Sequence, residues 1–157
     1  MRNLFFVILF LFITSCALQN KGREINLHKV DGVKNVAVKG YDVVSYFKEP
    51  RMGKVKPSKG TKDISYNFQD VTYFFENTQN LNRFKSSPEK YMPQYGGYCA
   101  YGVSVPQQKI DIEPTAWKIH EGKLYLNYTK RTQEIWLEDI EGHIEDANEN
   151  WPEVKIQ

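Results

Sequence analysis

The sequence predicts a small single domain of the α+β class, with two β-hairpins, a central strand and a C-terminal helix. Strand-like and helix-like stretches are mixed along the chain without a strict alternation of strand and helix, which disfavours a doubly wound parallel sheet. The chain has 157 residues, and the part over 25–157 is long enough for one domain with a substantial core.

The first residues have the order of a secretory signal. Arg2 precedes an apolar run, Leu4 to Ile13, which is too short to span a bilayer as a helix. The end of this run, "ITSC", resembles the bacterial lipobox, whose cysteine becomes the lipid-bearing N-terminus. We therefore expect a lipoprotein signal over 1–15, lipidation of Cys16 and a polar tether over 16–24. An ordinary signal peptide or an uncleaved anchor is the alternative.

The residue after Cys16 is Ala17, and an aspartate at this position would favour retention in the inner membrane. The expected location is therefore the cell envelope, with a lipid anchor in the outer membrane. The membrane would be reached through this anchor alone, because lysines and acids are interspersed and the formal net charge is +2. The same charge pattern gives no basic stripe for nucleic acid, so we expect no nucleic-acid partner.

The first half of the domain combines a capped turn with a hairpin and two helices. Asp42 is placed to cap a short helix or turn that ends at Pro50, and a basic loop follows over 51–62. Apolar and polar residues alternate around Gln69-Asp70, which predicts a hairpin over 63–76. The next stretch, 77–92, reads as a helix followed by a second short helix that starts at Ser87-Pro88.

The second half is expected to hold a strand, a hairpin and a helix. The sequence "GGYCAYGVSV", residues 96–105, predicts the central strand. Two β-rich runs joined at Glu121-Gly122 form the clearest hairpin signal, over 115–129. The tail over 130–154 is helical, with apolar residues at core-facing spacing: Ile135, Trp136, Ile140 and Ile144.

Three segments together resemble the YHS-domain proteins of the bacterial envelope. They are "GYDVVSYF", "YFFENTQNLNRFKSSPEKYMPQYGGYCAYGV" and "AWKIHEGKLYLNYTKRTQEIWLEDIEGHIEDANENWP", which span about 40–152. The resemblance implies the fold of that group. Related YHS domains carry a cysteine-rich turn for a soft metal, whereas here the matching positions hold Glu76, Asn77 and Asn80. The resemblance therefore does not imply that metal site.

Cys99 is the cysteine whose role decides between the function classes. With Cys16 lipidated, Cys99 has no intramolecular partner, and it is interpreted as a buried structural thiol, a metal ligand or a redox thiol. In a strand, Gly97, Cys99 and Tyr101 would share one face. A nucleophilic cysteine needs a base, but His28, His120 and His143 have no catalytic signature around them and are interpreted as surface residues. The sequence therefore does not support an enzyme.

The residues around Cys99 carry the functional hypothesis. Cu or Zn could bind Cys99 together with Met92 and a histidine, because soft sulfur ligands suit Cu(I). The phenols nearby could instead line a small polar-aromatic pocket: Tyr91, Tyr95, Tyr98 and Tyr101. The expected role is thus non-enzymatic binding of a small ligand or a transition-metal ion near Cys99. The alternatives are an interaction module with an envelope protein partner, and a thiol-dependent redox protein.

Overall fold

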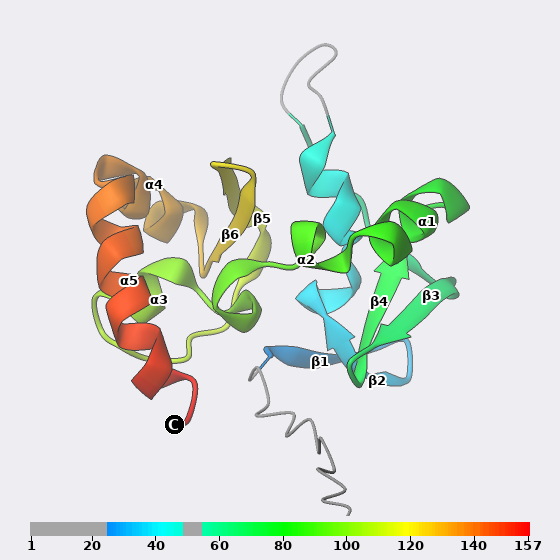
Figure 1. Cartoon of the computed structure of the whole chain (residues 1–157), viewed down its shortest axis with the longest axis horizontal. Coiled ribbons are helices and arrows are strands. Elements are labelled where there is room, and N and C mark those ends of the chain that lie inside the picture. Colours follow the sequence, from blue (N-terminus) through cyan, green and yellow to red (C-terminus); the bar gives the residue numbers. More distant parts are fainter. Residues whose placement is uncertain (1–24, 49–54) are drawn as a thin grey trace, which may run out of the picture.

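The computed structural model describes residues 25–48 and 55–157, and over these ranges it confirms a small single domain of the α+β class (Figure 1). The predicted signal peptide, Cys16, the tether and Pro50 lie outside the described residues, as does part of the loop over 51–62. None of the described helices is long and apolar enough to cross a membrane.

A four-stranded sheet forms one side of the domain. Its strands are β1 (Leu27–Val30), β2 (Val33–Ala37), β3 (Thr61–Phe68) and β4 (Val71–Phe75), in the order β1-β2-β4-β3. The two hairpins are antiparallel, and β2 runs parallel to β4. The hairpin of β3 and β4 is the one predicted around Gln69-Asp70. The β1–β2 hairpin was not predicted, although its Asp31-Gly32 turn, with both φ angles positive, is a standard hairpin signal.

Two 3-10 helices, η1 (Val38–Gly40) and η2 (Val43–Phe47), connect β2 to the second hairpin. Asp42 caps η2, as predicted, because its Oδ1 accepts a hydrogen bond from the backbone amide of Val44 at 2.9 Å. The same buried carboxylate accepts bonds through Oδ2 from the Glu76 amide at 3.0 Å and from the Asn80 side chain at 2.7 Å. Asp42 thereby joins η2 to the end of β4 and the start of the following helix.

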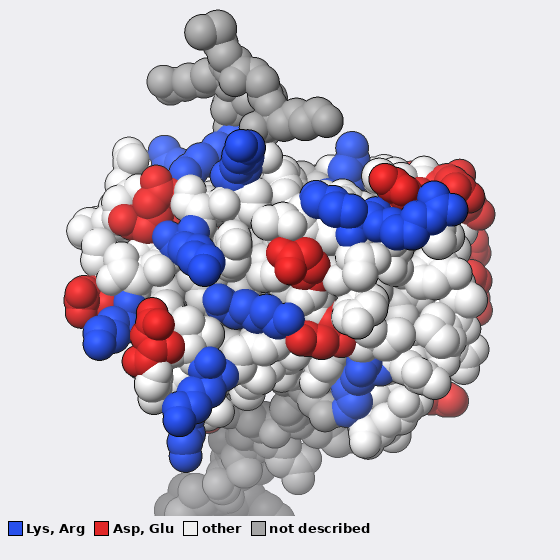
Figure 2. All heavy atoms as spheres, turned by 180° about the vertical axis from the view of Figure 1, so that it is seen from behind, with Lys and Arg blue, Asp and Glu red and all other residues white. Residues whose placement is uncertain are grey.

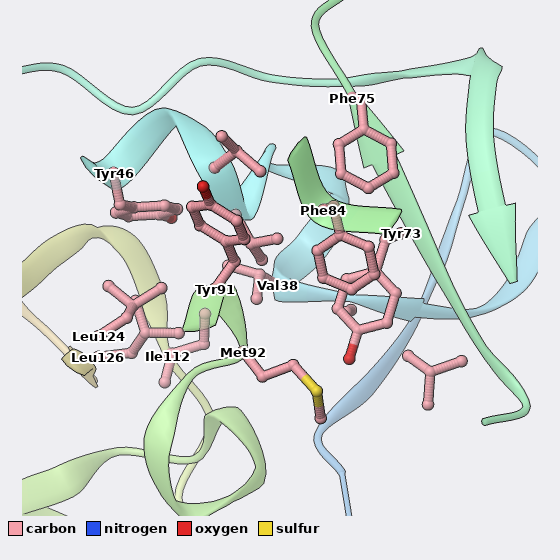
Figure 3. Packing of buried hydrophobic residues seen from close by; sticks show 14 of the residues in the cluster. Val38, Tyr46, Tyr73, Phe75, Phe84, Tyr91, Met92, Ile112, Leu124 and Leu126 are labelled. Atoms are coloured by element: carbon pink, nitrogen blue, oxygen red, sulfur yellow. The ribbon is translucent and has the colours of Figure 1, made fainter. Parts of the chain in front are cut away.

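Helices α1 (Thr78–Ser86) and α2 (Pro88–Tyr91) confirm the helix pair predicted over 77–92. Asn77 caps α1 through a bond from the Asn80 amide to its side-chain oxygen. Phe84 on α1 is fully buried against the sheet, where its ring lies 4.6 Å from that of Tyr73. Figure 3 shows this contact and the neighbouring aromatic residues of the same buried cluster. Burial of these rings holds α1 on the sheet.

A second layer contains β5 (Glu113–His120), β6 (Lys123–Asn127), α4 (Lys130–Glu138) and α5 (Ile140–Val154). The hairpin turn at Glu121-Gly122 is as predicted. The tail forms two helices instead of one, because Asp139 leaves the helical conformation and caps α5 by accepting a bond from Gly142. Lys130 and Gln133 of α4 donate to backbone carbonyls of β5, so that α4 covers the outer edge of this hairpin.

The prediction of a central strand over 96–105 is wrong. This stretch belongs to η3 (Gln94–Gly97) and to the short helix α3 (Ala100–Ser104). Tyr95, Gly96 and Gly97 all have positive φ, at 51, 60 and 80°, and this left-handed turn reverses the chain before a strand can form. Cys99 keeps one isolated bridge to Leu126 of β6 and then caps α3. As a result, the residues on either side of Cys99 do not alternate between two faces of a sheet.

Candidate functional site

Cys99 lies in the core and is 0% exposed. Its sulfur accepts hydrogen bonds from the backbone amides of Gly102 and Tyr128, each at 3.3 Å. The thiol faces the side-chain oxygen of Asn127 at 3.7 Å, and this oxygen also accepts a bond from the Tyr101 amide. The sulfur thus takes the place of the oxygen that usually caps a helix, and it connects α3 to the end of β6.

The protonation of this thiol follows from the same surroundings. Burial raises the pKa of Cys99, and the hydrogen bonds from backbone amides oppose that shift only in part. The thiol therefore stays protonated at neutral pH and can donate to Asn127. A nucleophile or metal ligand needs the thiolate, which this environment disfavours. The geometry around Cys99 is that of a structural residue.

A cavity of about 270 Å³ lies elsewhere, beside Tyr95, and we refer to it as the Tyr95 cavity. Five stretches of the sequence form its walls, and the lining residues are Ile25, Asn26, Ala37, Val38, Tyr73, Glu89, Met92, Pro93, Gln94, Tyr95, Gly96, Asn148 and Trp151. Figure 3 shows the thioether of Met92 and the hydroxyl of Tyr73 extending toward the same side of the core, and both residues line the cavity. The cavity lies where the sheet with its preceding segment meets α5.

Two aromatic rings form a corner of this cavity. The ring of Tyr95 lies 5.9 Å from that of Trp151, with 63° between the planes. Tyr98 packs against Trp151 at 6.4 Å and supports it. The Tyr95 hydroxyl donates to the side-chain oxygen of Asn148 at 3.1 Å, and burial raises the pKa of this phenol, so it remains a donor. These contacts fix the orientation of Tyr95 and Asn148 on the cavity wall.

The N-terminal part of the wall is held by Asn26. Its backbone amide donates to Gly96 at 2.9 Å, and its side chain donates to Gly97 at 3.3 Å and to Asp111 at 3.0 Å. These bonds attach the N-terminal segment to the left-handed turn that carries Tyr95. Val38 on the same wall has a φ of 47°, which is strained for a β-branched residue. Two of the lining segments, at Val38 and at Tyr95-Gly96, therefore contain left-handed backbone.

Some hydrogen-bonding groups on the wall have no protein partner. Among the described residues, the side-chain amide of Gln94 makes no hydrogen bond. The side-chain oxygen of Asn148 accepts from Tyr95, and the side-chain nitrogen of Asn148 makes no hydrogen bond. Among the described lining residues Glu89 is the only acid, and there is no lysine, arginine or histidine. The cavity thus offers aromatic surface, amide donors and acceptors, and one carboxylate at its wall.

The residues predicted as a site do not lie together. Met92 and Tyr95 line the cavity and are 6% and 7% exposed, and Tyr98 lies behind Trp151. Tyr91 packs against Phe47, and Tyr101 packs against His143. Cys99 does not line the cavity. The tyrosines around Cys99 in the sequence therefore do not surround it as a single pocket.

Sequence reasoning missed four lining residues that offer contacts to a ligand: Asn26, Gln94, Asn148 and Trp151. A signal was present in α5, because Asn148 and Trp151 are three residues apart and so share one face of the helix. Asn26 carried no local signal, since its role depends on contacts more than 70 residues away in the chain.

The described residues provide no cluster of ligands for the predicted metal site. Within 25–48 and 55–157, no three histidine, cysteine, aspartate or glutamate side chains are grouped so that they could hold an ion. His120 pairs with Glu141 at 2.8 Å, and His143 lies 3.4 Å from the Ser104 hydroxyl. His28 lies 3.7 Å from Asp111. None of these contacts involves Cys99.

Comparison with known proteins gives no further information on this chain. No family model, no curated protein and no solved structure matches it.

Proposed function

We propose that this protein is a non-enzymatic binding protein that holds a small organic molecule in the Tyr95 cavity. The cavity itself carries the proposal, because it combines about 270 Å³ of space with aromatic rings and unpaired amide groups on the same wall. Sites for small molecules are mostly apolar hollows with a few convergent polar groups. The Tyr95 cavity has this composition, and its rings and amides are held by hydrogen bonds to the backbone and to α5.

An organic ligand accounts for these features better than a metal ion at Cys99. The Cys99 sulfur already accepts two backbone hydrogen bonds, and burial keeps its thiol protonated. Met92, the proposed second sulfur ligand, lines the cavity, where Cys99 is absent. The candidate ligands of a soft metal thus belong to different sites, whereas the aromatic and amide groups belong to one.

The same proposal includes the setting inferred from the sequence. The protein would be a member of the YHS-domain group, attached to the outer membrane by a lipid on Cys16. This rests on the lipobox-like "ITSC" and on the quoted motifs. Mass spectrometry of the N-terminal peptide tests it: a lipid-bearing Cys16 is expected, and Cys16→Ser should leave the membrane fraction. An unmodified Cys16 in a chain that starts at Met1 would contradict the anchor.

Ligand binding is tested by a screen of small organic fragments against the full-length chain, with saturation-transfer NMR as the readout. The blocked variant is Gln94→Trp, because Gln94 lines the cavity and makes no hydrogen bond that the change would remove. The matched control is Gln79→Trp, which adds the same side chain to the exposed surface of α1. Equal melting temperatures of the three proteins would exclude unfolding as the cause of any difference.

We expect fragments that bind the parent and Gln79→Trp but not Gln94→Trp. A screen without binders, or binders that Gln94→Trp leaves unchanged, would contradict the proposal. In that case an interaction module with a structural Cys99 becomes the better explanation.

A further inference from the structure

We propose that the ligand of the Tyr95 cavity is a carbohydrate, held as a single sugar ring. The apolar face of the ring would pack on the corner of Tyr95 and Trp151, and its hydroxyls would bond to Gln94 and Asn148. This inference rests on the proposed function, namely that the cavity binds a small molecule. It adds the chemical class of that molecule.

The arrangement of the two rings offers no parallel slot for a flat ligand. A flat heteroaromatic ring is held well between parallel or offset faces. Tyr95 and Trp151 instead meet at 63° with their centroids 5.9 Å apart, so they do not form a parallel slot. A sugar ring presents C–H groups on one face and hydroxyls around its edge. Such a ring can contact one aromatic face while its edge turns toward the neighbouring polar groups.

The polar groups of the wall require a ligand that both donates and accepts. The Gln94 amide has an oxygen and a nitrogen without a partner among the described residues, and the Asn148 nitrogen is also available. A hydroxyl is donor and acceptor at once, so several hydroxyls on one ring can satisfy all these atoms. The Gln94 amide is half-buried, so leaving it unpaired against an apolar ligand would cost binding free energy.

The charge of the lining argues against ionic ligands. An anion would meet Glu89 and, among the described lining residues, no lysine, arginine or histidine. The nearby Lys39 is bound to Asp111, with 2.7 Å between its Nζ and the carboxylate. An organic cation could pack on the aromatic rings but would leave the half-buried amide of Gln94 unpaired. A neutral polyhydroxylated ring uses both the aromatic rings and the amides.

The volume limits the size of the ligand. At about 270 Å³ the cavity lies close to the lower end of ligand sites, which span about 300–1,000 Å³. This space suits one small ring with its substituents. It does not suit a cofactor with several fused rings.

The test is a titration of the full-length chain, kept in one detergent at fixed concentration, with glucose, galactose, mannose and N-acetylglucosamine. Amide shifts are followed by two-dimensional NMR. Cyclohexanol is the matched probe, because its ring has six members but only one hydroxyl. Gln94→Met removes the amide while it keeps the length of the side chain, and Gln79→Met makes the same change at an exposed position of α1.

We expect at least one sugar to bind at millimolar concentration and to shift the amides over 94–97 and 148–151. Gln94→Met should weaken this binding about tenfold, the order expected for lost hydrogen bonds, and Gln79→Met should not change it. If cyclohexanol binds as tightly as the sugars, or if Gln94→Met has no effect, recognition of hydroxyls is contradicted. If no sugar binds but a fragment from the screen does, the sugar class is wrong and the proposed function stands. Failure of both would overturn both.

Discussion

The sulfur of Cys99 accepts a hydrogen bond from the backbone amide of Tyr128, 3.3 Å away. This bond ties the N-terminus of α3 to the residue that follows β6, and a second bond from the Gly102 amide makes the sulfur the cap of α3. A cysteine that caps a helix in a core serves as an acceptor and as a small apolar residue at once. Its substitution should therefore separate the two roles.

Cys99→Ala should destabilise the protein by about 2 kcal/mol, because it removes the cap and leaves a small void. Cys99→Ser keeps an acceptor and should cost clearly less, about 1 kcal/mol. Urea unfolding followed by circular dichroism measures both. Ser86→Ala, an exposed change on α1, is the control and should stay within about 0.5 kcal/mol of the parent. Equal loss in the serine and alanine variants would refute the capping role.

The Cys99 thiol should resist alkylation in the folded protein. It is 0% exposed, and burial raises its pKa, so both access and thiolate are lacking. Treatment with iodoacetamide at neutral pH, with peptide mass spectrometry as readout, should modify Cys99 only after urea is added. Fast modification of the native chain would support the thiol-dependent redox alternative.

Metal binding should not depend on Cys99. Native mass spectrometry after equilibration with Cu(I) or Zn(II) should give the same ion count for the parent and for Cys99→Ser, because the sulfur is already occupied by backbone amides. One ion that the parent keeps and the serine variant loses would restore the metal-site hypothesis at Cys99.

Asp42→Asn should destabilise the protein strongly, by about 2–4 kcal/mol. The carboxylate is fully buried and accepts from Val44, Glu76 and Asn80. An asparagine would turn one acceptor oxygen into a donor that faces other donors. The shift of the urea midpoint gives the cost, and Asp63→Asn on the exposed part of β3 is the matched control. A loss no larger than that of the control would contradict the role assigned to Asp42.

Local signals explain which parts of this fold were predictable. The cap at Asp42 and the turn at Glu121-Gly122 depend on residues within a few positions, and both were predicted from the sequence. The stretch around Cys99 was not predicted, because Tyr95 has a positive φ, which a tyrosine in the sequence does not indicate. The backbone amide of Cys99 then bonds to Ile110 instead of to a neighbouring strand.

The candidate site was predictable only in part for the same reason. Met92 and Tyr95 lie in the segment that the sequence marked, so they were found. The N-terminal part of the wall depends on Asn26, and the aromatic corner depends on Trp151 of α5. These residues come from both ends of the domain and are brought together only by the tertiary structure. Their spacing in the sequence therefore does not predict that they line one cavity.

The pH dependence of stability should show a contribution from His28 on β1. Burial is the largest cause that lowers the pKa of His28 below its ordinary value of 6.5; Asp111 opposes this shift and Lys39 adds to it. Between the two pKa values the unfolded chain binds the proton more strongly than the folded chain does. The contribution of neutral His28 is therefore complete above pH 6.5 and is lost as the pH falls from 6.5 to the lowered pKa.

Urea midpoints measured from neutral pH down to about pH 5 should decrease in the parent, and His28→Gln should flatten this slope. The range stops at about pH 5 so that the protonation of carboxylates does not contribute. Asp111 is one of them: burial raises its pKa, but the hydrogen bonds from Lys39 and Asn26 outweigh this effect, so the pKa is lowered. His120→Gln is the control, because His120 pairs with the exposed Glu141 and lies on the other hairpin. It should keep the slope of the parent. A slope that His28→Gln leaves unchanged would show that the pH dependence arises from other groups.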